Sequence, residues 1–518
     1  MNNRLVPLML VLSCGLLEVG STIFLGMVPR ARITEIMVFI SFGLTLSAAL
    51  LAGRLPVQGA KTGGVERLFL LVLLVSLYMT LILQMFQGMD IGDRNPEIRK
   101  LGAICLAVVC IGIIPYISLL FPAGPKTARV SGLCTPALIA FILGVGCLLK
   151  VAGIIYEKQP MIDVWEVMQG GAIHLSQWHN PFASALPKAA ALGVGFSGAA
   201  PAYVYMPSTL LLSYPAVAWA GDCRYAYVLA DLASAILLLL IGRRLKNEGG
   251  NPLVARASEL AALLVMFHPS SFAKTWNDML AVPIIFGFIL MHLRNPLGKA
   301  QAVMAGFMLS LKQYEIFLVV PVAFLLRKPS RLVIAAIAGV ATTLPFLIWD
   351  AGALYSSLTV HTGVPFRSDG ISLGTFLFHL FGMRIPSWIG VASAAALTVA
   401  SCLYASRRGM VGTLSWGAAI LLALFLGATP SSRTITSLSY ASCSPVRFLR
   451  WGRAPSYKAV VNIGRCLPVK GRVHYAQQPV SSGAPVCFSA AAGGCNVPRL
   501  RRLRRFNERR RGERLPGP

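Results

Sequence analysis

The sequence predicts an all-α, polytopic transmembrane protein with about eleven spans and one re-entrant hairpin. Of its 518 residues, 56% are hydrophobic and only 13% are charged, whereas soluble domains carry roughly 25% charged residues. The mean hydropathy is +0.68. Several apolar runs reach the ~20 residues that a helix needs to cross a bilayer.

The first 132 residues are predicted to form an N-terminal region of four spans. Apolar runs give these spans at residues 5–27, 33–53, 68–87 and 101–122. The first run continues past Cys14, as a spanning helix does and a signal peptide does not. A fifth span, 133–156, opens a membrane core that we expect to extend from residue 133 to residue 429.

Lys and Arg residues set the predicted orientation, because cytoplasmic loops hold the excess of these residues. They gather at the N-terminus, in the loop after the second span and in the loop after the fourth span. We therefore expect a multi-pass inner-membrane protein with a cytoplasmic N-terminus. The same rule places residues 157–222 outside, as a large external or periplasmic loop.

Residues 157–222 are the longest interruption between apolar runs, and they carry Asp163, Glu166, His174, His179 and Lys188. The later part of this loop, 203–220, is apolar, but a full crossing there would put the following cationic cluster on the outer side. We expect this part to lie along the outer membrane face, or to dip in and return. Its prolines at 201, 207 and 215 are predicted to break it into short pieces.

The second half of the core contains a predicted hairpin. Spans are predicted at 225–241, 252–272 and 279–293, and then the segment 300–326 has cations on both sides, at Lys299 and Arg327. A segment that starts and ends inside must turn back, so we predict a tip at Lys312-Gln313. Spans at 331–349, 388–405 and 412–429 complete the core, with a second external loop at 350–387.

Asp163 is the candidate catalytic base, because it stands just past a span end, beside Trp165. A carboxylate there can take a proton from an acceptor hydroxyl, although a solvated side chain or a helix N-cap explains it as well. Glu166 would share a helix face with it. Such a pair could also bind a divalent cation. Because the sequence offers no third ligand, we predict no metal site and no firm cofactor.

Lys312 is the candidate phosphate contact. An ionisable group deep in an apolar segment defaults to a functional hypothesis, and a lysine is a point charge that suits a phosphate; snorkelling to the interface is the structural alternative. His361 and Arg367, in the second external loop, could neutralise the same phosphate. Asp278 stands outside at a helix start, where capping explains it as well as catalysis does.

The order of several motifs resembles the class C integral-membrane glycosyltransferases, and within them a bacterial mannosyltransferase-like group of unknown function. A span leads into a large external loop with an early aspartate, IDVWEVMQGG, followed by Asn180-Pro181-Phe182, YVYMP and Asp222. The turn HPSSFAKTWND, the tip LSLKQ and the loop VPFRSDGISLGTF resemble later family elements. The likeness covers about residues 133–429.

This resemblance implies an inverting transfer of a mannose-like sugar from a polyprenyl-phosphate carrier to an acceptor hydroxyl on a glycan, lipid or protein. It implies that Asp163 is the base and that Lys312 and Arg367 contact the phosphate. We place Gln313, His361, His179 and Asp278 in the same substrate-binding set. The residues alone do not select a sugar over another substrate.

Two other functions stay open. A polytopic transporter often has broken helices and charges near the midplane, but we find no inverted repeat here. A polysaccharide polymerase or ligase also uses lipid-linked sugars. The eleven cysteines show no CxxC or Cys/His spacing, which disfavours a zinc site or a disulfide framework.

The last 89 residues, 430–518, differ from the rest. They hold 17 Lys and Arg against two acidic residues, so +15 of the total charge of +28 lies there. The apolar periodicity stops after Leu426, and we expect a disordered basic tail that arises from a frameshifted translation. We therefore predict no nucleic-acid partner in spite of the charge.

Overall fold

The computed structural model describes the following residues: 9, 12–13, 40, 43–44, 46–47, 67–78, 80–81, 96–121, 135–157, 163–184, 202–248, 252–267, 277–296, 298–359, 377, 381–383, 386, 388–405 and 409–427. The chain divides into two units, Met1–Ser456 and Tyr457–Pro518, and every described residue belongs to the first. The elements formed by these residues are all helices, without a strand, which confirms the predicted helical class. The tail from 430 onward lies outside the described residues.

Four of the described helices are long and apolar enough to cross a membrane. They are α4 (Pro96–Ile117) with the short η2 (Ser118–Leu120) that continues it, α6 (Pro136–Tyr156), α9 (Arg224–Asn247) and α14 (Pro329–Thr359). Each overlaps one of the predicted spans. Helices of this length and hydropathy indicate an integral membrane protein.

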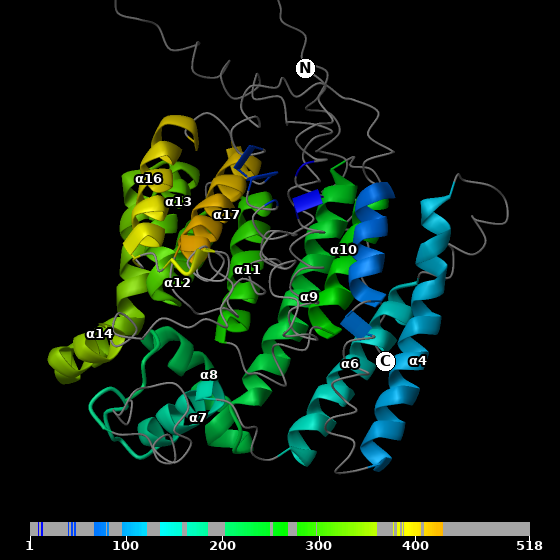
Figure 1. The fold of residues 1–518 in the computed structure, drawn as a ribbon, viewed down its shortest axis with the longest axis horizontal. Coiled ribbons are helices and arrows are strands. Elements are labelled where there is room, and N and C mark those ends of the chain that lie inside the picture. The colour runs from blue at the N-terminus through cyan, green and yellow to red at the C-terminus, as the bar shows by residue number, and fades with distance from the viewer. Residues whose placement is uncertain are drawn as a thin grey trace, which may run out of the picture. The chain divides into compact units, whose positions relative to one another are not determined.

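Shorter helices stand beside the long ones in Figure 1. They are α10 (Pro252–Phe267), α11 (Ala281–Arg294), α12 (Lys299–Ser310), α13 (Val319–Leu326), α16 (Trp388–Ala405) and α17 (Gly409–Gly427). The predicted runs from residue 252 onward coincide with these helices. The first two predicted spans lie almost entirely outside the described residues, so the number of eleven spans stays a prediction.

Two helices of the predicted external loop lie across one end of the upright helices, α7 (Asp163–Ser176) and α8 (Pro207–Ala220) (Figure 1). The prolines do not divide α8 into short pieces, which corrects the prediction. Pro207 is the first helical residue, where the missing N–H would have no partner in any helix. Pro215 lies inside the helix, and it removes one backbone hydrogen bond without ending α8.

A tight corner joins α8 to the long helix α9. Gly221 adopts a left-handed conformation with φ 77° and ends α8, a role that glycine fills at least cost. Asp222 then pairs with Arg224 at 2.7 Å. The Arg224 guanidinium also donates to the carbonyl oxygens of Ile154 and Glu157 at the end of α6. The corner therefore joins the ends of α6, α8 and α9.

The chain reverses at Lys312, as the sequence predicted. The connection between α12 and α13 is the short helix η4 (Gln313–Leu318). At the opposite end, the Arg331 guanidinium donates to the carbonyl oxygens of Pro296 and Leu326, at 3.2 and 2.9 Å. Since Pro296 precedes α12 and Leu326 ends α13, both ends of the segment meet at one place. The path is a hairpin, which we call the tip hairpin (residues 299–326).

The first arm of the tip hairpin packs closely on α14. A Cβ atom added at Gly306 would lie 2.1 Å from the carbonyl oxygen of Ala335, and one added at Gly339 would lie 3.0 Å from that of Gly306. Small residues at a helix crossing let two backbones approach in this way. This close packing fixes the position of the hairpin along α14.

The helix α14 continues beyond the predicted span end. Asp350 has non-helical angles (φ −161°, ψ 97°), and a further helical stretch runs on to Thr359. The side chain of Asp350 accepts a hydrogen bond from the Ala353 amide at 2.9 Å, so it caps this second stretch. The predicted loop 350–387 therefore begins with a helix. Asp350 in a capping position is the sequence signal that could have indicated this helix.

Candidate functional site

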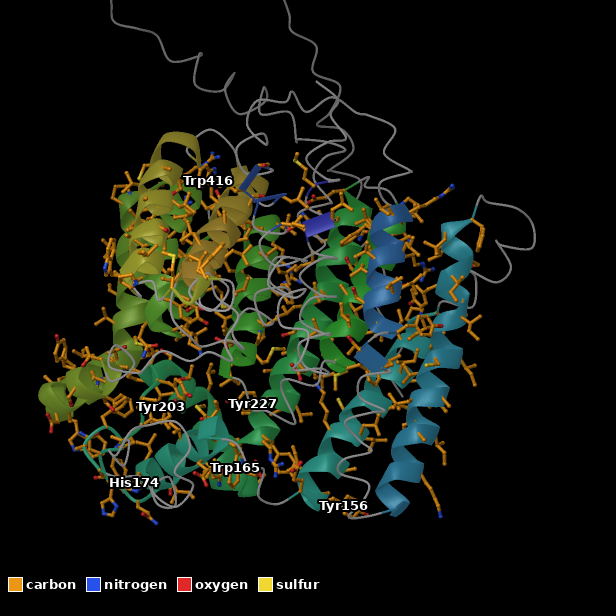
Figure 2. All side chains as sticks on the ribbon, viewed as in Figure 1. Tyr156, Trp165, His174, Tyr203, Tyr227 and Trp416 are labelled. Atoms are coloured by element: carbon orange, nitrogen blue, oxygen red, sulfur yellow. The ribbon has the colours of Figure 1, made fainter. Side chains whose placement is uncertain are left out.

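The end of the tip hairpin meets the external loop. The Gln313 side chain donates to the Val204 carbonyl at 3.1 Å. The neighbouring Tyr203 is fully buried, and its hydroxyl forms a 2.8 Å hydrogen bond with Thr209 in α8 and contacts the Met168 sulfur in α7. Figure 2 shows Tyr203 between α7 and the ends of the upright helices. Gln313 thus connects the tip to the loop, and its role in substrate binding stays a prediction.

Lys312 lies at the centre of a polar group that we call the tip cluster: the buried Asp278, Lys312 and Glu315 and the half-buried Tyr205 and Tyr314. The Lys312 ammonium pairs with the Asp278 carboxylate at 2.9 Å, and their side chains are 7% and 9% exposed. The Tyr314 hydroxyl donates a short hydrogen bond to the same carboxylate. The ammonium also lies 5.4 and 5.7 Å from the ring centroids of Tyr205 and Tyr314, within the range of a cation–π contact.

Glu315 fixes the backbone of the tip. Its carboxylate accepts a hydrogen bond from the Lys312 amide at 3.2 Å, in a capping box at the start of η4. Glu315 is only 3% exposed. The cluster therefore places two carboxyl groups and one ammonium in a small, nearly dry space.

This arrangement both supports and limits the predicted roles. Lys312 and Asp278, 34 positions apart in the sequence, form one ion pair, so the structure unites two members of the predicted substrate set. An ammonium has three donors, and its pairing with Asp278 is compatible with a further acceptor. However, a phosphate would compete with Asp278 for Lys312. The sequence did not predict this competition, because it placed Asp278 at a helix start and not at the tip.

Buried hydroxyl groups connect the tip hairpin to α8 and α14. The Ser208 hydroxyl in α8 lies 2.9 and 2.7 Å from the hydroxyl oxygens of Ser310, at the end of α12, and Thr342, in α14, and its single proton is shared between these two acceptors. Ser357 donates to the Tyr203 carbonyl at 2.6 Å. All of these side chains are buried. The external loop, the tip hairpin and α14 are thus held together by buried hydrogen bonds, which cost free energy when one partner is removed.

The helix α7 rests on the corner between α8 and α9. The Gln169 side chain donates to the Gly221 carbonyl and accepts from the Cys223 amide, both at 2.8 Å. One turn earlier, the Trp165 ring nitrogen donates to Asp222 at 3.4 Å. These contacts fix the first half of α7 next to the start of α9.

The predicted catalytic pair lies on this half of α7. Asp163 is the first helical residue, although its side chain lies outside the described atoms. Glu166 is half-buried, three residues later on the same helix, so the predicted spacing of the two residues along one helix is present. The tip hairpin touches the loop at Val204, and the hydroxyl of the neighbouring Tyr203 meets Met168, five positions after Asp163.

His179 does not join that pair. It follows the end of α7, and the 14 helical residues between span about 20 Å at 1.5 Å per residue. Its ring lies 5.8 Å from that of His174, edge to face, and it is exposed. Burial lowers the pKa of His174, and the nearby His179 lowers it further. The two histidines therefore form a separate feature at the other end of α7.

Two other groups near the corner are chemically inert. Burial raises the pKa of the Cys223 thiol well above its usual value, so Cys223 does not supply a thiolate nucleophile. Burial likewise raises the pKa of the Tyr203 hydroxyl, which keeps it protonated in its hydrogen bonds. Both residues are fully buried and act as packing for α7 and α9.

Several predicted residues cannot be placed. His361 and Arg367, and Lys188 in the first loop, lie outside the described residues. Within the part of the chain that is described, no three His, Cys, Asp or Glu side chains gather as a metal site. The open question of a divalent cation at Asp163 and Glu166 is not answered by this observation.

The sequence analysis missed one buried ion pair. Lys150 in α6 pairs with Asp231 in α9, and the two residues are 4% and 0% exposed. Each stands inside an apolar run, so the sequence carried a signal, since ionisable residues within spans are rare and usually paired. The sequence could not show that the two apolar runs, which form α6 and α9, lie side by side in the fold.

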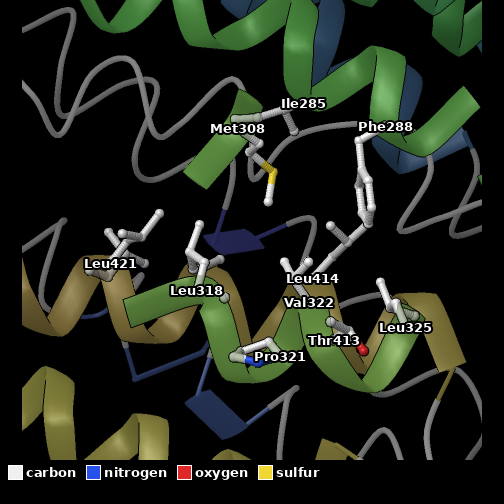
Figure 3. A pocket seen from close by; sticks show the side chains of 13 residues that line it. Ile285, Phe288, Met308, Leu318, Pro321, Val322, Leu325, Thr413, Leu414 and Leu421 are labelled. Atoms are coloured by element: carbon white, nitrogen blue, oxygen red, sulfur yellow. The ribbon is translucent and has the colours of Figure 1, made fainter. Parts of the chain in front are cut away.

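A small apolar cavity of about 70 Å³ lies beyond the tip cluster. Figure 3 shows that Phe288 of α11 and Met308 of α12 face Val322 of α13 and Leu414 of α17 across it. Among the described residues that line it, almost all are apolar and none is charged. Its size suits part of a hydrocarbon chain and not a sugar.

Comparisons of the chain with models of protein families, with curated proteins and with solved structures give no match. The resemblance to class C glycosyltransferases therefore rests on the motifs quoted above, and the function is a proposal.

Proposed function

We propose that this protein is a membrane glycosyltransferase that moves a mannose-like sugar from a polyprenyl-phosphate carrier to an acceptor hydroxyl on the external face. The observation that carries the proposal is the buried Lys312 at the tip of the hairpin, directly beneath the loop that bears Asp163. A lipid-linked donor has a phosphate at the membrane surface and a long apolar tail. The tip offers a cation, Lys312, and apolar helices α12, α13, α16 and α17 contact the short helix η4 that follows it.

The proposed chemistry is a single displacement. The acceptor hydroxyl attacks the anomeric carbon, its proton passes to the Asp163 carboxylate, and the bond between the anomeric carbon and the phosphate oxygen breaks. The negative charge on the departing polyprenyl phosphate grows in this step. An ammonium fixed in a site of low dielectric stabilises such charge far more than it would in water.

The tip cluster gives Lys312 the required rigidity. Asp278 and the rings of Tyr205 and Tyr314 hold the ammonium, and Glu315 holds its backbone. A catalytic charge that is already positioned needs little reorganisation when the reaction occurs. The exposed Trp219, at the end of α8, and Tyr156, at the end of α6, are typical of side chains at a membrane interface.

A transporter is the second candidate, because of Lys150 and Asp231. Paired ionisable residues inside spans mark proton or substrate pathways in many transporters. The pair is remote from the tip cluster in the sequence and belongs to α6 and α9. A polymerase or ligase that uses lipid-linked sugars would share the donor chemistry of the first candidate.

One experiment separates the transferase from the transporter. Membranes that contain the protein are incubated with radiolabelled polyprenyl-phosphate mannose and with radiolabelled free mannose, in sealed vesicles. A transferase consumes the lipid donor and yields a labelled, non-donor product. If labelled free sugar crosses the membrane while the lipid donor stays intact, the protein is a transporter and the proposal is wrong.

A further inference from the structure

A second cavity, of about 660 Å³, lies between α6, α9 and α10. These three helices contact one another and stand together in Figure 1. The walls are formed mainly by apolar side chains such as Leu143, Ile236 and Leu239. The cavity takes no part in the proposed transfer, whose residues lie at the tip cluster and in α7.

One end of this cavity is cationic. Arg243, Lys246 and Arg256 line it together with Glu259, the one carboxylate among the described lining residues. Arg256 pairs with Glu259 at 2.8 Å, and the Tyr116 hydroxyl donates to the same carboxylate at 2.9 Å. Arg243 and Lys246 are exposed, and they leave the lining with a net charge of +2.

The dimensions match one leaflet of a bilayer. On α9 the lining runs from Leu232 to Lys246, 14 positions that span about 21 Å at 1.5 Å per residue. Half of a hydrocarbon core is about 15 Å. The cations therefore stand at the depth of the headgroups when Leu232 is near the midplane, and the apolar walls extend along the acyl chains.

We propose that this cavity binds an anionic phospholipid, with the phosphate at Arg243 and Lys246 and an acyl chain between α6, α9 and α10. The charge selects an anionic headgroup over a zwitterionic one, and the apolar walls select a lipid over a soluble phosphate. By the distribution of Lys and Arg in the sequence, the site faces the cytoplasmic leaflet, where anionic lipids attract basic residues. The donor site is predicted on the opposite face.

The test measures lipid binding to the purified full chain. Native mass spectrometry counts bound dioleoyl-phosphatidylglycerol as the lipid is titrated, with dioleoyl-phosphatidylcholine and inorganic phosphate as comparison ligands. A basic residue near the surface contributes about 1 kcal/mol, so the double variant Arg243→Gln/Lys246→Gln is expected to bind about 30-fold more weakly. The matched control is Arg244→Gln, since Arg244 pairs with Glu248 and does not line the cavity.

A second variant tests the cavity itself without changing charge. A Cβ atom added at Gly144, which lines the cavity, meets no atom within 4 Å, so Gly144→Phe should occupy the space and displace the lipid. Gly102 in α4 is equally open and lies outside the lining, and Gly102→Phe should leave binding unchanged. Equal binding of phosphatidylcholine, competition by inorganic phosphate, or equal losses in variant and control would each overturn the proposal.

Discussion

The ion pair between Lys312 and Asp278 gives the sharpest prediction. Both side chains are more than nine-tenths buried, and their charged atoms lie 2.9 Å apart. Removing one member of a buried pair costs about 3–5 kcal/mol, because the other charge is left without its partner. In Lys312→Met the Asp278 carboxylate keeps the hydrogen bond from Tyr314, so the lower end of that range, about 3 kcal/mol, is expected.

The double variant separates pairing from packing. Asp278→Asn alone removes the carboxylate that pairs with Lys312 at 2.9 Å and should cost about as much as Lys312→Met. When both changes are combined, no buried charge of the pair remains, and we expect the combined loss to be well below the sum of the single losses. The free energy of unfolding of all four proteins, measured by denaturant titration in one detergent, gives the coupling. Additive losses, or single losses below about 1 kcal/mol, would refute the buried pair.

The same variants distinguish a structural role from a donor contact. If the donor phosphate competes with Asp278 for Lys312, Asp278→Asn should bind the donor at least as tightly as the wild type, in spite of its lower stability. Lys312→Met should weaken donor binding by the value of a charged hydrogen bond, about 1.5–3 kcal/mol, or about 10- to 150-fold in Kd. A parallel loss of donor binding in both variants would mean that the pair acts only through folding.

Three further predictions concern the external loop and the tail. Gly171→Ala places a Cβ atom 2.4 Å from the buried ring of Tyr203, so overpacking should lower the free energy of unfolding by about 1–3 kcal/mol; a gain in stability would show that the ring can move. Because the pKa of His174 is lowered on folding from its usual 6.5, the unfolded chain binds more protons, and stability should fall as pH drops through about 6.5; His174→Leu should flatten this dependence, and an unchanged pH profile would contradict it. Sequencing the gene around the codon for Thr429 should reveal a one-base change that opens an apolar reading frame, whereas stop codons in every alternative frame would make the tail genuine.

The sequence predicted where the helices lie along the chain better than it predicted which helices contact one another. Apolar runs located the starts of α6, α9 and α14 within three residues, because a span needs ~20 apolar residues in any folded state. Cations on both sides of one run also predicted the reversal at Lys312. These signals are local, or depend only on which side of a membrane a loop occupies.

The contacts of the candidate site were not readable in this way. Nothing in the sequence indicates that Asp278 meets Lys312, since they belong to different segments and each has a local explanation, as a cap and as a snorkelling side chain. The pair formed by Lys150 and Asp231 was missed for the same reason. Pro215 was misread because a proline inside a helix removes one hydrogen bond, and the tertiary contacts of α8 compensate for it.

We propose that Asp163, at the start of α7, accepts a proton while the sugar leaves a polyprenyl phosphate. The most direct measurement is the initial rate of label transfer from radiolabelled polyprenyl-phosphate mannose, by the purified protein in liposomes, for the wild type and for Asp163→Asn. Loss of a general base lowers a rate by about 10²–10⁴-fold, so the variant should fall by that factor while it binds the donor normally. Equal rates in the two proteins would contradict the account.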